Sequence, residues 1–482
     1  MWLSKLLGNL ASVKNDVEFS QIKLDSRNIK KGDVFFAVAG CQQHGMQYAE
    51  VVIEQGAAAI VYDPAQEGQK LANELNFKNL IAIEGLNKKL GEIADQFYVH
   101  PTDQLNVIGI TGTNGKTSCS QFLAQMMEST AVIGTLGSGL YGDLQVSNNT
   151  TPNAFDLQKL LAGFVKQYVQ NVAMEVSSHG LEQGRVNVVN FTGAVFNNLS
   201  RDHLDYHGNM ENYFQAKNLL FKWPSLQFVV LNADDEYSVR IKAELNAEIK
   251  VLSYSLIKGG DEDLVARNIR YTAQGISCEV LWNKQCESLN AALLGEFNLQ
   301  NILAAMAVLL MQGYSLSESA LAANKVQPII GRMECFKAKN GALTVVDYAH
   351  TPDALEKVLT TLRQHCNRQL RVVFGCGGNR DVGKRAQMGC IAERLADDII
   401  VTDDNPRFEN SQSIIDAIVT DLDRQKISCI ADREVAIRQA ITKSEKGDIV
   451  LIAGKGHEEY QEINGIKTTF SDRALVQEII NK

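Results

Sequence analysis

The sequence predicts an α/β protein with three domains, and two observations carry this prediction. Apolar runs typical of buried strands alternate with helical segments along most of the 482 residues, as expected for parallel βαβ units. Several of these runs end in polar or glycine-rich turns, where doubly wound sheets place their ligands. We expect a small N-terminal α/β domain, a central P-loop-type doubly wound sheet and a C-terminal Rossmann-like domain.

The N-terminal domain is predicted over residues 1–87. Short apolar strands at 34–38 and 58–62 flank a helical stretch at 49–55. A further helix, predicted at 88–98, then leads into the next domain.

The central domain is predicted over residues 88–330. The pattern becomes hairpin-like between about 265 and 294, and a long apolar helix at 298–312 closes the region. Buried strands are predicted at 105–110, 171–176, 193–197, 227–232 and 248–252.

The C-terminal domain is predicted over residues 331–482. Three of its strands end in polar turns, at 347–350, 375–378 and 454–457, which indicates a ligand cleft at one edge of the sheet. The strands are predicted at 343–347, 370–374, 398–402 and 448–452.

The composition excludes several classes of protein. A formal net charge of −9 argues against nucleic-acid binding, which favours a basic face. No run approaches the ~20 apolar residues of a membrane span. The nine cysteines form no C-x-x-C pair, which indicates reduced thiols. We expect a cytoplasmic protein that binds no nucleic acid and does not insert into a membrane.

The most informative motif is the segment 111–117, Thr-Gly-Thr-Asn-Gly-Lys-Thr, which follows the strand at 105–110. Glycines let backbone N–H groups surround an anion, and the next helix adds its positive end. Lys116 would reach the outer phosphates and the Thr117 hydroxyl would contact Mg²⁺. The first glycine of the general P-loop pattern falls on Ile110, so an ordinary strand–helix turn stays an alternative.

Glu175 ends another predicted strand, where a carboxylate suits Mg²⁺ because hard cations take oxygen ligands. The following Ser178-His179 pair could indicate a serine hydrolase. Adjacent side chains rarely face each other, however, and no G-x-S-x-G surrounds them. The magnesium interpretation is therefore favoured.

The segment 197–207 is dense in polar, ligand-capable residues. His203 and His207 are four residues apart, but no Glu follows His203, so this is not a zincin helix. A capped turn with a structural histidine stays open. Lys217, taken alone, is typical of a lysine on a helix surface.

Two turns of the C-terminal domain carry arginines, Arg380 and Arg407. An arginine fork binds carboxylates in a bidentate manner. Each arginine alone could form a surface ion pair. Together with the turn from Gly454 to Glu458, they favour a substrate cleft.

In order and spacing these motifs resemble one family, the Mur ligases, over essentially the whole chain. The segments at 149–151 and 404–407 resemble the members that form the muramoyl tripeptide. The family-wide segments are 111–117, 175–180, 199–208, 295–298, 331–334 and 347–353.

The resemblance implies an ATP-dependent amide ligase of bacterial peptidoglycan synthesis, which we expect to be a monomer. The substrate carboxylate of UDP-MurNAc-L-Ala-D-Glu attacks the γ-phosphate of ATP and forms an acyl phosphate. The amino group of a diamino acid then displaces the phosphate. In-line phosphoryl transfer needs positioning and charge neutralisation, which Lys116 and two Mg²⁺ ions would supply.

The resemblance also implies the nucleotide and metal sites. Thr117 and Glu175 would hold one Mg²⁺. His203 and a carbamylated Lys217 (N6-carboxylysine) would hold or organise the second, which replaces the interpretation of Lys217 as a surface lysine. Further nucleotide contacts are implied at Gly112, Thr113, Asn114, Gly115, Ser118, Asn301, Arg332 and His350.

Three substrate regions are implied in the same way. The uridine-nucleotide pocket matches Leu24, Ser26, Cys41, Gln42 and Gln43. The positions that grip the muramoyl dipeptide match Asn149, Thr150, Thr151, Ser177, Gln183 and Arg185. The amino-acid site matches Arg380, Asp404, Asn405, Pro406, Arg407, Gly454 and Glu458.

The turn at 405–407, Asn-Pro-Arg, resembles members that add meso-diaminopimelate, whose distal carboxylate would pair with Arg407. L-Lysine stays the alternative amino acid.

Other interpretations fit the sequence less well. The segment at 24–27 and the Asn-Pro-Arg turn count against a folylpolyglutamate synthetase-like ligase and against a MurF-like ligase. A non-catalytic ATP-binding switch would lack a metal or carbamate residue, yet all are present. The acidic balance disfavours a DNA-dependent ATPase.

Overall fold

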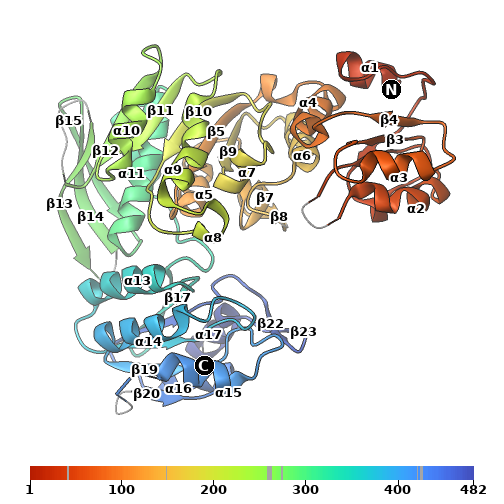
Figure 1. Cartoon of the computed structure of the whole chain (residues 1–482). Helices are drawn as coiled ribbons and strands as arrows, with labels where there is room; N and C mark the ends of the chain where they lie inside the picture. Colours follow the sequence, from red (N-terminus) through yellow and green to blue (C-terminus); the bar gives the residue numbers. More distant parts are fainter. Residues whose placement is uncertain are drawn as a thin grey trace. The chain divides into compact units, whose positions relative to one another are not determined.

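The structure is a computed structural model that describes residues 1–40, 43–147, 149–257, 263–272, 275–420, 422–423 and 427–481. By its internal contacts the chain divides into two compact units, Met1–Tyr254 and Ser255–Lys482 (Figure 1).

The first unit begins with a small parallel sheet. Alternate side chains of its second strand enter opposite faces. Phe35 packs against α2 (Ala49–Glu54) and α3 (Gly68–Glu74), whereas Phe36 packs against α1 (Leu3–Leu7) and α4 (Leu86–Tyr98). Both faces are buried, which explains why the strands are continuously apolar. The order is β1 (Ile22–Lys23), β2 (Val34–Ala37), β3 (Ala59–Tyr62), β4 (Leu80–Ala82).

The larger sheet of the first unit runs β12-β11-β10-β5-β9-β6-β7-β8 and is parallel except at β7, which pairs antiparallel with both β6 and β8. In this order β5 lies between β10 and β9, so their carboxyl ends share one edge. The strands are β5 (Asn106–Thr111), β6 (Thr130–Gly134), β7 (Gly137–Leu140), β8 (Asp143–Gln145), β9 (Asn171–Glu175), β10 (Phe191–Phe196), β11 (Phe228–Asn232) and β12 (Lys250–Ser255).

Six helices accompany this sheet. Side chains of α6, α7, α9 and α10 share one hydrophobic core with its strands. The helices are α5 (Lys116–Met126), α6 (Ala154–Lys166), α7 (Ser178–Glu182), α8 (Leu204–His207), α9 (Met210–Asn218) and α10 (Tyr237–Glu244).

The second unit begins with an antiparallel meander of β13 (Leu264–Thr272), β14 (Gly275–Trp282) and β15 (Gln285–Ala291). The helix α11 (Glu296–Met311) follows, and twelve of its sixteen residues are buried, as expected for its apolar sequence. It packs on α12 (Leu316–Ala323).

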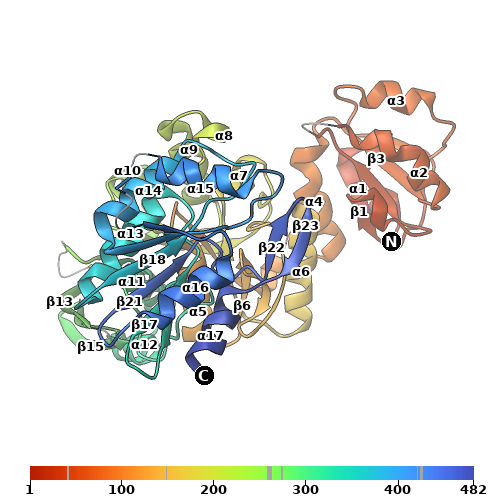
Figure 2. The same ribbon diagram turned by 90° about the horizontal axis from the view of Figure 1, so that it is seen from below.

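The C-terminal sheet runs β16-β17-β21-β18-β19-β20, parallel except for β16. One face packs on α13, α14 and α15 and the other on α16 and α17. The hairpin of β22 (Tyr460–Ile463) and β23 (Ile466–Thr469) forms a small sheet of its own (Figure 2). The strands are β16 (Glu334–Lys337), β17 (Leu343–Asp347), β18 (Leu370–Phe374), β19 (Asp398–Val401), β20 (Ile427–Cys429) and β21 (Ile449–Ala453).

The helices of this part are α13 (Pro352–His365), α14 (Lys384–Leu395), α15 (Ser411–Val419), α16 (Arg433–Thr442) and α17 (Asp472–Asn481). The α/β class and the predicted strands are confirmed, and the predicted strand ends agree with the structure to within three residues. The sequence did not predict nine short strands, which are β1, β4, β6, β7, β8, β16, β20, β22 and β23 among the described residues. The domain boundaries at 87 and 330 stay predictions. In the described part of the chain, no helix is long and apolar enough to cross a membrane.

Candidate active site

The phosphate loop of the first unit joins β5 to α5. Gly115 precedes the helix with a left-handed backbone (φ 84°), and a Cβ on Gly112 would stand only 3.0 Å from the Cβ of Asn197. The amino group of Lys116 donates to the carbonyls of Gly112 and Thr113, at 2.8 and 2.9 Å. Lys116 is therefore held over the loop, at the positive end of α5.

The loop that follows β10 braces this turn. The N–H of Thr113 donates to the carbonyl of Asn198, and the N–H of Asn114 donates to the Asn198 side chain, each at 2.9 Å. The Thr113 hydroxyl lies 2.9 Å from the N–H of Ser200, which donates to it. Sequence reasoning noticed this polar segment but not that it shapes the phosphate loop.

Glu175 is fully buried at the end of β9 and accepts hydrogen bonds from two elements. The Thr117 hydroxyl donates to Oε2 at 3.0 Å, and the Thr135 N–H donates to Oε1 at 2.9 Å. Burial raises the pKa of the Glu175 carboxyl, against the lowering effects of Thr135, Lys116 and Thr117. The residues predicted to hold one Mg²⁺, Thr117 and Glu175, are thus in direct contact.

Lys217 is a buried residue of α9, not a surface lysine. Its amino group donates 2.9 Å to the carbonyl of Gly112 and lies 4.6 Å from the ring centre of Tyr213. Burial, and secondly the charge of Lys116, hold the pKa of the Lys217 amine well below its ordinary value.

His203 precedes α8 in a left-handed backbone conformation (φ 53°). Its ring lies 3.4 Å from the Asp202 carboxylate and packs against the ring of His179, with centroids 5.0 Å apart. Among the described residues no group of three His, Cys, Asp or Glu side chains could hold a metal ion. A metal at this edge would also need hydroxyl, carbamate or phosphate oxygens.

The Ser178 hydroxyl contacts a histidine of another helix, His207. His207 Nε2 lies 3.0 Å from the Ser178 hydroxyl, and Nδ1 lies 3.2 Å from the Glu182 carboxylate. Ser178 is only 1% exposed, so no substrate can reach its hydroxyl. The group joins α7 to α8, and this geometry argues against a serine hydrolase.

Four of the six residues predicted to grip the dipeptide are connected. The Thr151 hydroxyl donates to the Ser177 hydroxyl at 3.1 Å. Arg185 donates to the Thr151 carbonyl at 2.8 Å and to the Gln183 side chain at 2.6 Å. The Thr150 hydroxyl lies 3.0 Å from that of Thr135, whereas Asn149 is exposed and its N–H faces Ser147.

The predicted uridine pocket is described only in part. Leu24 is half-buried against the N-terminal core, and Ser26 begins a short 3₁₀ helix that Asp25 caps. The Gln43 side chain accepts a hydrogen bond from the Tyr48 hydroxyl at 2.8 Å. Cys41 and Gln42 lie outside the described residues.

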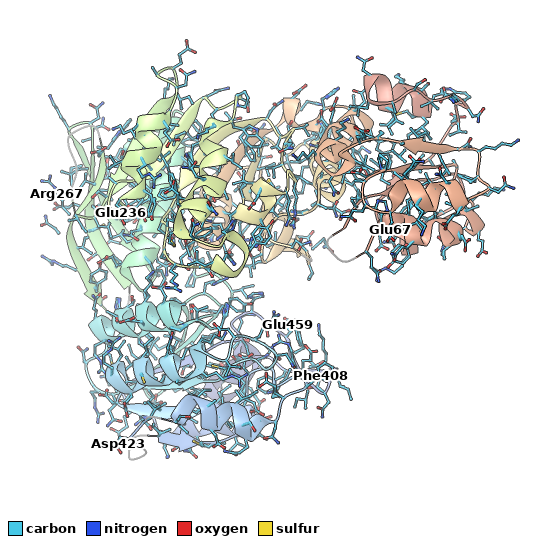
Figure 3. The ribbon with its side chains drawn as sticks, in the orientation of Figure 1. Glu67, Glu236, Arg267, Phe408, Asp423 and Glu459 are labelled. Atoms are coloured by element: carbon cyan, nitrogen blue, oxygen red, sulfur yellow. The ribbon has the colours of Figure 1, made fainter. Side chains whose placement is uncertain are left out.

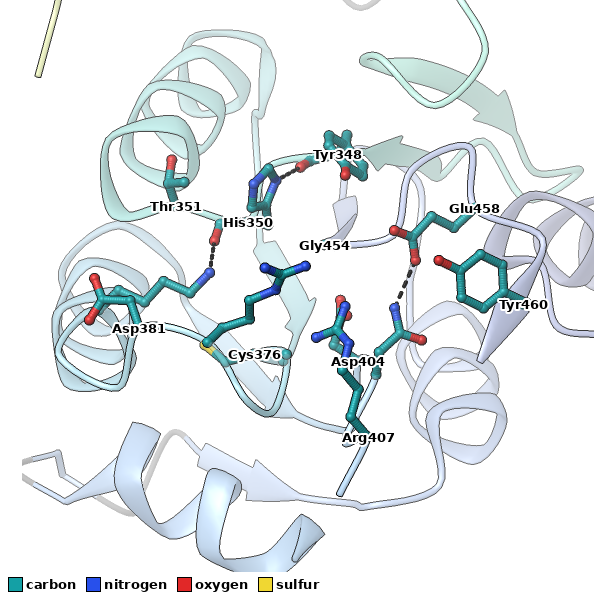
Figure 4. Close-up of a pocket in the computed structure, with 15 residues that line it drawn as sticks. Tyr348, His350, Thr351, Cys376, Asp381, Asp404, Arg407, Gly454, Glu458 and Tyr460 are labelled. Carbon is teal, nitrogen blue, oxygen red and sulfur yellow. Dashed lines mark hydrogen bonds between the residues drawn. The ribbon is translucent and has the colours of Figure 1, made fainter. Parts of the chain in front are cut away.

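A pocket of about 540 Å³ opens at the carboxyl edge of the C-terminal sheet (Figure 4). Its charged side chains are of both signs in equal number, which suits a zwitterionic ligand. They are Arg380, Lys384, Arg407, Asp381, Asp404 and Glu458. Six of the seven residues predicted for the amino-acid site line it, together with His350; Pro406 is buried within the adjoining turn.

Asn405 and Glu458 are held on the pocket wall by Lys455, which is fully buried. Lys455 Nζ donates to the Asn405 oxygen at 3.1 Å and to the Glu458 carboxylate at 3.0 Å. The Asn405 amide nitrogen donates in turn to Glu458 at 2.9 Å (Figure 4). Burial raises the pKa of nearby Asp404, while Arg433 and Lys455 lower it. Sequence reasoning missed Lys455, although it lies inside the glycine-rich turn.

Arg407 also has a left-handed backbone (φ 53°). Its Nη1 donates to the Gly378 carbonyl at 2.8 Å, and its Nε lies 3.5 Å from the Glu462 carboxylate. Both contacts fix the guanidinium at the pocket wall.

Three of the predicted nucleotide contacts, Asn301, Arg332 and His350, lie in the second unit. Asn301 is buried in α11. The Arg332 guanidinium lies over the Tyr348 ring, 4.8 Å from its centre, and His350 Nδ1 lies 2.8 Å from the Tyr348 carbonyl. Because that carbonyl can only accept, the Nδ1 of His350 is the donor.

Comparisons with known proteins assign the chain to a family. Residues 18–98 match the "Mur ligase family, catalytic domain", 110–309 the "Mur ligase middle domain" and 331–456 the "Mur ligase, glutamate ligase domain". The UDP-N-acetylmuramoyl-L-alanyl-D-glutamate--2,6-diaminopimelate ligase of Pseudomonas putida is 44% identical over 98% of this chain and 96% of its own. The chain belongs to the Mur ligase family.

Other Mur ligases agree. The Xylella fastidiosa protein of the same name is 41% identical over 100% of this chain and 97% of its own. A solved structure of a ligase with this name is 35% identical, with a TM-score of 0.70 over 96% of this chain and 95% of that one. The MurF ligase of Thermotoga maritima in complex with ADP shares the fold at 18% identity, with a TM-score of 0.64 over 95% of this chain and 96% of its own.

Proposed function

We propose that this protein is an ATP-dependent ligase that joins meso-2,6-diaminopimelate to UDP-N-acetylmuramoyl-L-alanyl-D-glutamate in peptidoglycan synthesis. The observation that carries the proposal is the mixed-charge pocket of the second unit, in a chain 44% identical to ligases named for this reaction. We also propose that it acts as a monomer in the bacterial cytoplasm.

In the first unit, the chain's own groups would hold and orient the triphosphate. The main-chain N–H groups at the start of α5 and the Lys116 amine would face its outer phosphates. Ser118 lies in the first turn of the same helix. Positioned in this way, the γ-phosphorus can accept the substrate carboxylate in line, which yields ADP and an acyl phosphate.

The Thr117 hydroxyl and the Glu175 carboxylate fit a magnesium ion, because both supply oxygen and already lie within 3.0 Å of each other. His203 and a carbamylated Lys217 would provide the second site. Mg²⁺ bound there supplies neutralisation of phosphate charge.

Lys217 suits carbamylation because its amine is buried and holds its proton weakly. A neutral amine adds to the carbon of CO₂ and releases one proton, leaving a carbamate anion on Nζ. The buried lysine is thereby converted into an oxygen ligand.

The other substrates would occupy three places. Leu24, Ser26, Cys41, Gln42 and Gln43 would contact the uridine nucleotide. The network of Thr151, Ser177, Gln183 and Arg185 would hold the dipeptide. In the pocket of the second unit, Asp404 and Glu458 would face the ammonium groups of diaminopimelate, and Arg407 its distal carboxylate.

Phosphate release tests the proposal. The protein is mixed with UDP-MurNAc-L-Ala-D-Glu, ATP and Mg²⁺, and meso-diaminopimelate is compared with L-lysine. We expect turnover with diaminopimelate and a tripeptide product of the corresponding mass, and none in a Lys116→Ala variant. Turnover with lysine alone would favour the alternative amino acid, and turnover with neither would refute the ligase.

A further inference from the structure

The β22–β23 hairpin contacts the turn that carries Asn405 and Arg407, and one residue of the hairpin touches both. The N–H of Glu462 donates to the Asn405 side-chain oxygen at 3.0 Å. The carbonyl of Glu462 accepts from the Arg407 N–H at 2.9 Å, and its carboxylate lies 3.5 Å from Arg407 Nε. Glu462 therefore contacts two pocket residues through three separate groups, its N–H, its carbonyl and its carboxylate.

The backbone contacts explain how Arg407 keeps its unusual conformation. A left-handed backbone is unfavourable for a residue with a Cβ unless neighbouring groups fix it. Glu462 binds the N–H of Arg407, and the N–H of Asn464 donates to its carbonyl at 2.6 Å. The hairpin thus holds the main chain from which the guanidinium enters the pocket.

The side-chain contacts decide which edge of the guanidinium faces the cavity. A guanidinium can meet a carboxylate through its Nε–Nη2 edge or through its Nη1–Nη2 edge. Glu462 occupies the side of Nε, and the Gly378 carbonyl takes one hydrogen of Nη1. Nη2 and the second hydrogen of Nη1 are left to receive a carboxylate in the pocket.

Both charges are only one-fifth exposed, at 21% for Arg407 and 19% for Glu462, so solvent screens the pair less than at an open surface. Figure 4 shows Arg407 and Asp404 among the residues that line the pocket. The Glu462 carboxylate does not line the pocket, so it acts on a ligand through Arg407.

We infer that Glu462 is a positioning residue that determines specificity: it aims the Arg407 guanidinium so that amino acids with a second carboxylate are preferred over those that end in an ammonium group alone. This inference rests on the proposed ligase function. It adds the β22–β23 hairpin to the amino-acid site.

The test is the steady-state kinetics of Glu462→Gln in the full chain. The substitution keeps the side-chain shape and both backbone contacts, and removes only the charge. We expect KM for meso-diaminopimelate to rise about tenfold, while kcat and the KM values of ATP and the UDP substrate change less than about twofold. The preference for diaminopimelate over L-lysine should fall by the same factor.

Glu459→Gln is the matched control, because Glu459 is exposed three residues away (Figure 3) and the chemical change is identical. A second arm combines Glu462→Gln with Arg407→Ala. If Glu462 acts through Arg407, Glu462→Gln should not change the KM for diaminopimelate any further in the Arg407→Ala background.

Three results would overturn the inference: an unchanged KM for diaminopimelate, an equal rise in the KM of ATP, or an undiminished effect in the Arg407→Ala background. In each of these the unsubstituted protein still uses diaminopimelate, so the ligase proposal survives. Failure of the unsubstituted protein to use diaminopimelate would instead overturn both.

Discussion

The Thr117 hydroxyl donates a 3.0 Å hydrogen bond to the Glu175 carboxylate, and this bond joins the first turn of α5 to the end of β9. Thr117 and Glu175 are 58 residues apart in the chain. They meet because β5 and β9 are neighbours in a parallel sheet, so that the loop after one strand and the last residue of the other share an edge. The proposed metal site is therefore assembled by strand order.

Gly134, the last residue of β6, should be essential to this arrangement. A Cβ there would stand 2.1 Å from Glu175 Oε1, so Gly134→Ala must displace the carboxylate. Misplacement of such a group by about 1 Å can cost on the order of a hundredfold in rate, and we expect kcat to fall by that factor in phosphate release. Unfolding in urea should show a loss of about 1–3 kcal/mol from overpacking.

Gly163→Ala is the matched control for that variant, because Gly163 lies in α6 and a Cβ there would meet nothing within 4 Å. Its activity should be unchanged, and its stability equal or higher by up to about 1 kcal/mol, since alanine favours a helix. Full activity of Gly134→Ala would contradict the assignment of Glu175 to the site.

His457 should make stability depend on pH. Burial, and secondly the charge of Arg332, lower its pKa from 6.5 to about 4. Between these values the unfolded chain binds the proton and the folded chain does not, so stability falls as the pH is lowered from 6.5 towards 4.

His457→Phe keeps a ring against Tyr348, whose centroid lies 5.1 Å away, and removes the titration. From pH 7.5 to pH 4.5 the variant should lose less free energy of unfolding than the unsubstituted protein, by on the order of 2 kcal/mol. Urea denaturation at both pH values measures this. Equal losses in the two proteins would exclude a proton-linked role for His457.

The sequence allowed the architecture and the strand-end residues to be predicted, because apolar runs mark buried strands and the polar residue after each run must lie at the sheet edge. It did not reveal partners that tertiary packing brings together. Ser178 and His207 are 29 residues apart, and Asn405 and Glu462 are 57 apart. Neither contact corresponds to a periodic pattern in the sequence.

The burial of single polar residues could not be predicted from the sequence either. Lys217 lies on a helix with a polar sequence, and Lys455 lies between two glycines, yet both are 2% exposed or less. Only the family resemblance singled out Lys217 beforehand. Whether a lysine faces water or the core depends on what covers its helix, which the local sequence does not contain.

The ion pair of Arg433 and Asp472 should dominate the stability of the C-terminal sheet region. Both side chains are 0% exposed, and the arginine contacts Asp472 through two nitrogens at 2.8 and 2.7 Å. Arg433→Met would leave the Asp472 charge buried alone, at a cost of about 3–5 kcal/mol in the free energy of unfolding.

Arg438→Met on the same helix provides the comparison for Arg433. Arg438 pairs with Glu434 and Glu478 at 37% side-chain exposure, and such surface pairs contribute at most about 1 kcal/mol. Urea unfolding of both variants measures the difference. Equal losses would mean that the buried pair is no more important than the exposed one.

Lys217 provides the test of the proposed carbamate. Lys217→Ala should lower turnover about ten- to a hundredfold, because the variant lacks the buried amine that CO₂ would modify. Short carboxylates such as acetate or propionate should restore part of the turnover by taking the place of the carbamate. Protein equilibrated with ¹³C-bicarbonate should show a carbamate carbon signal by NMR, and the Lys217→Ala variant should lack this signal. Lys222→Ala is the control and should retain the signal, because Lys222 is half exposed in the 3₁₀ helix that follows α9. A signal that persists in Lys217→Ala would place the modification on another residue. The site would instead require the free amine, held against the Gly112 carbonyl, if the unsubstituted protein shows no signal and carboxylates do not restore the activity of Lys217→Ala.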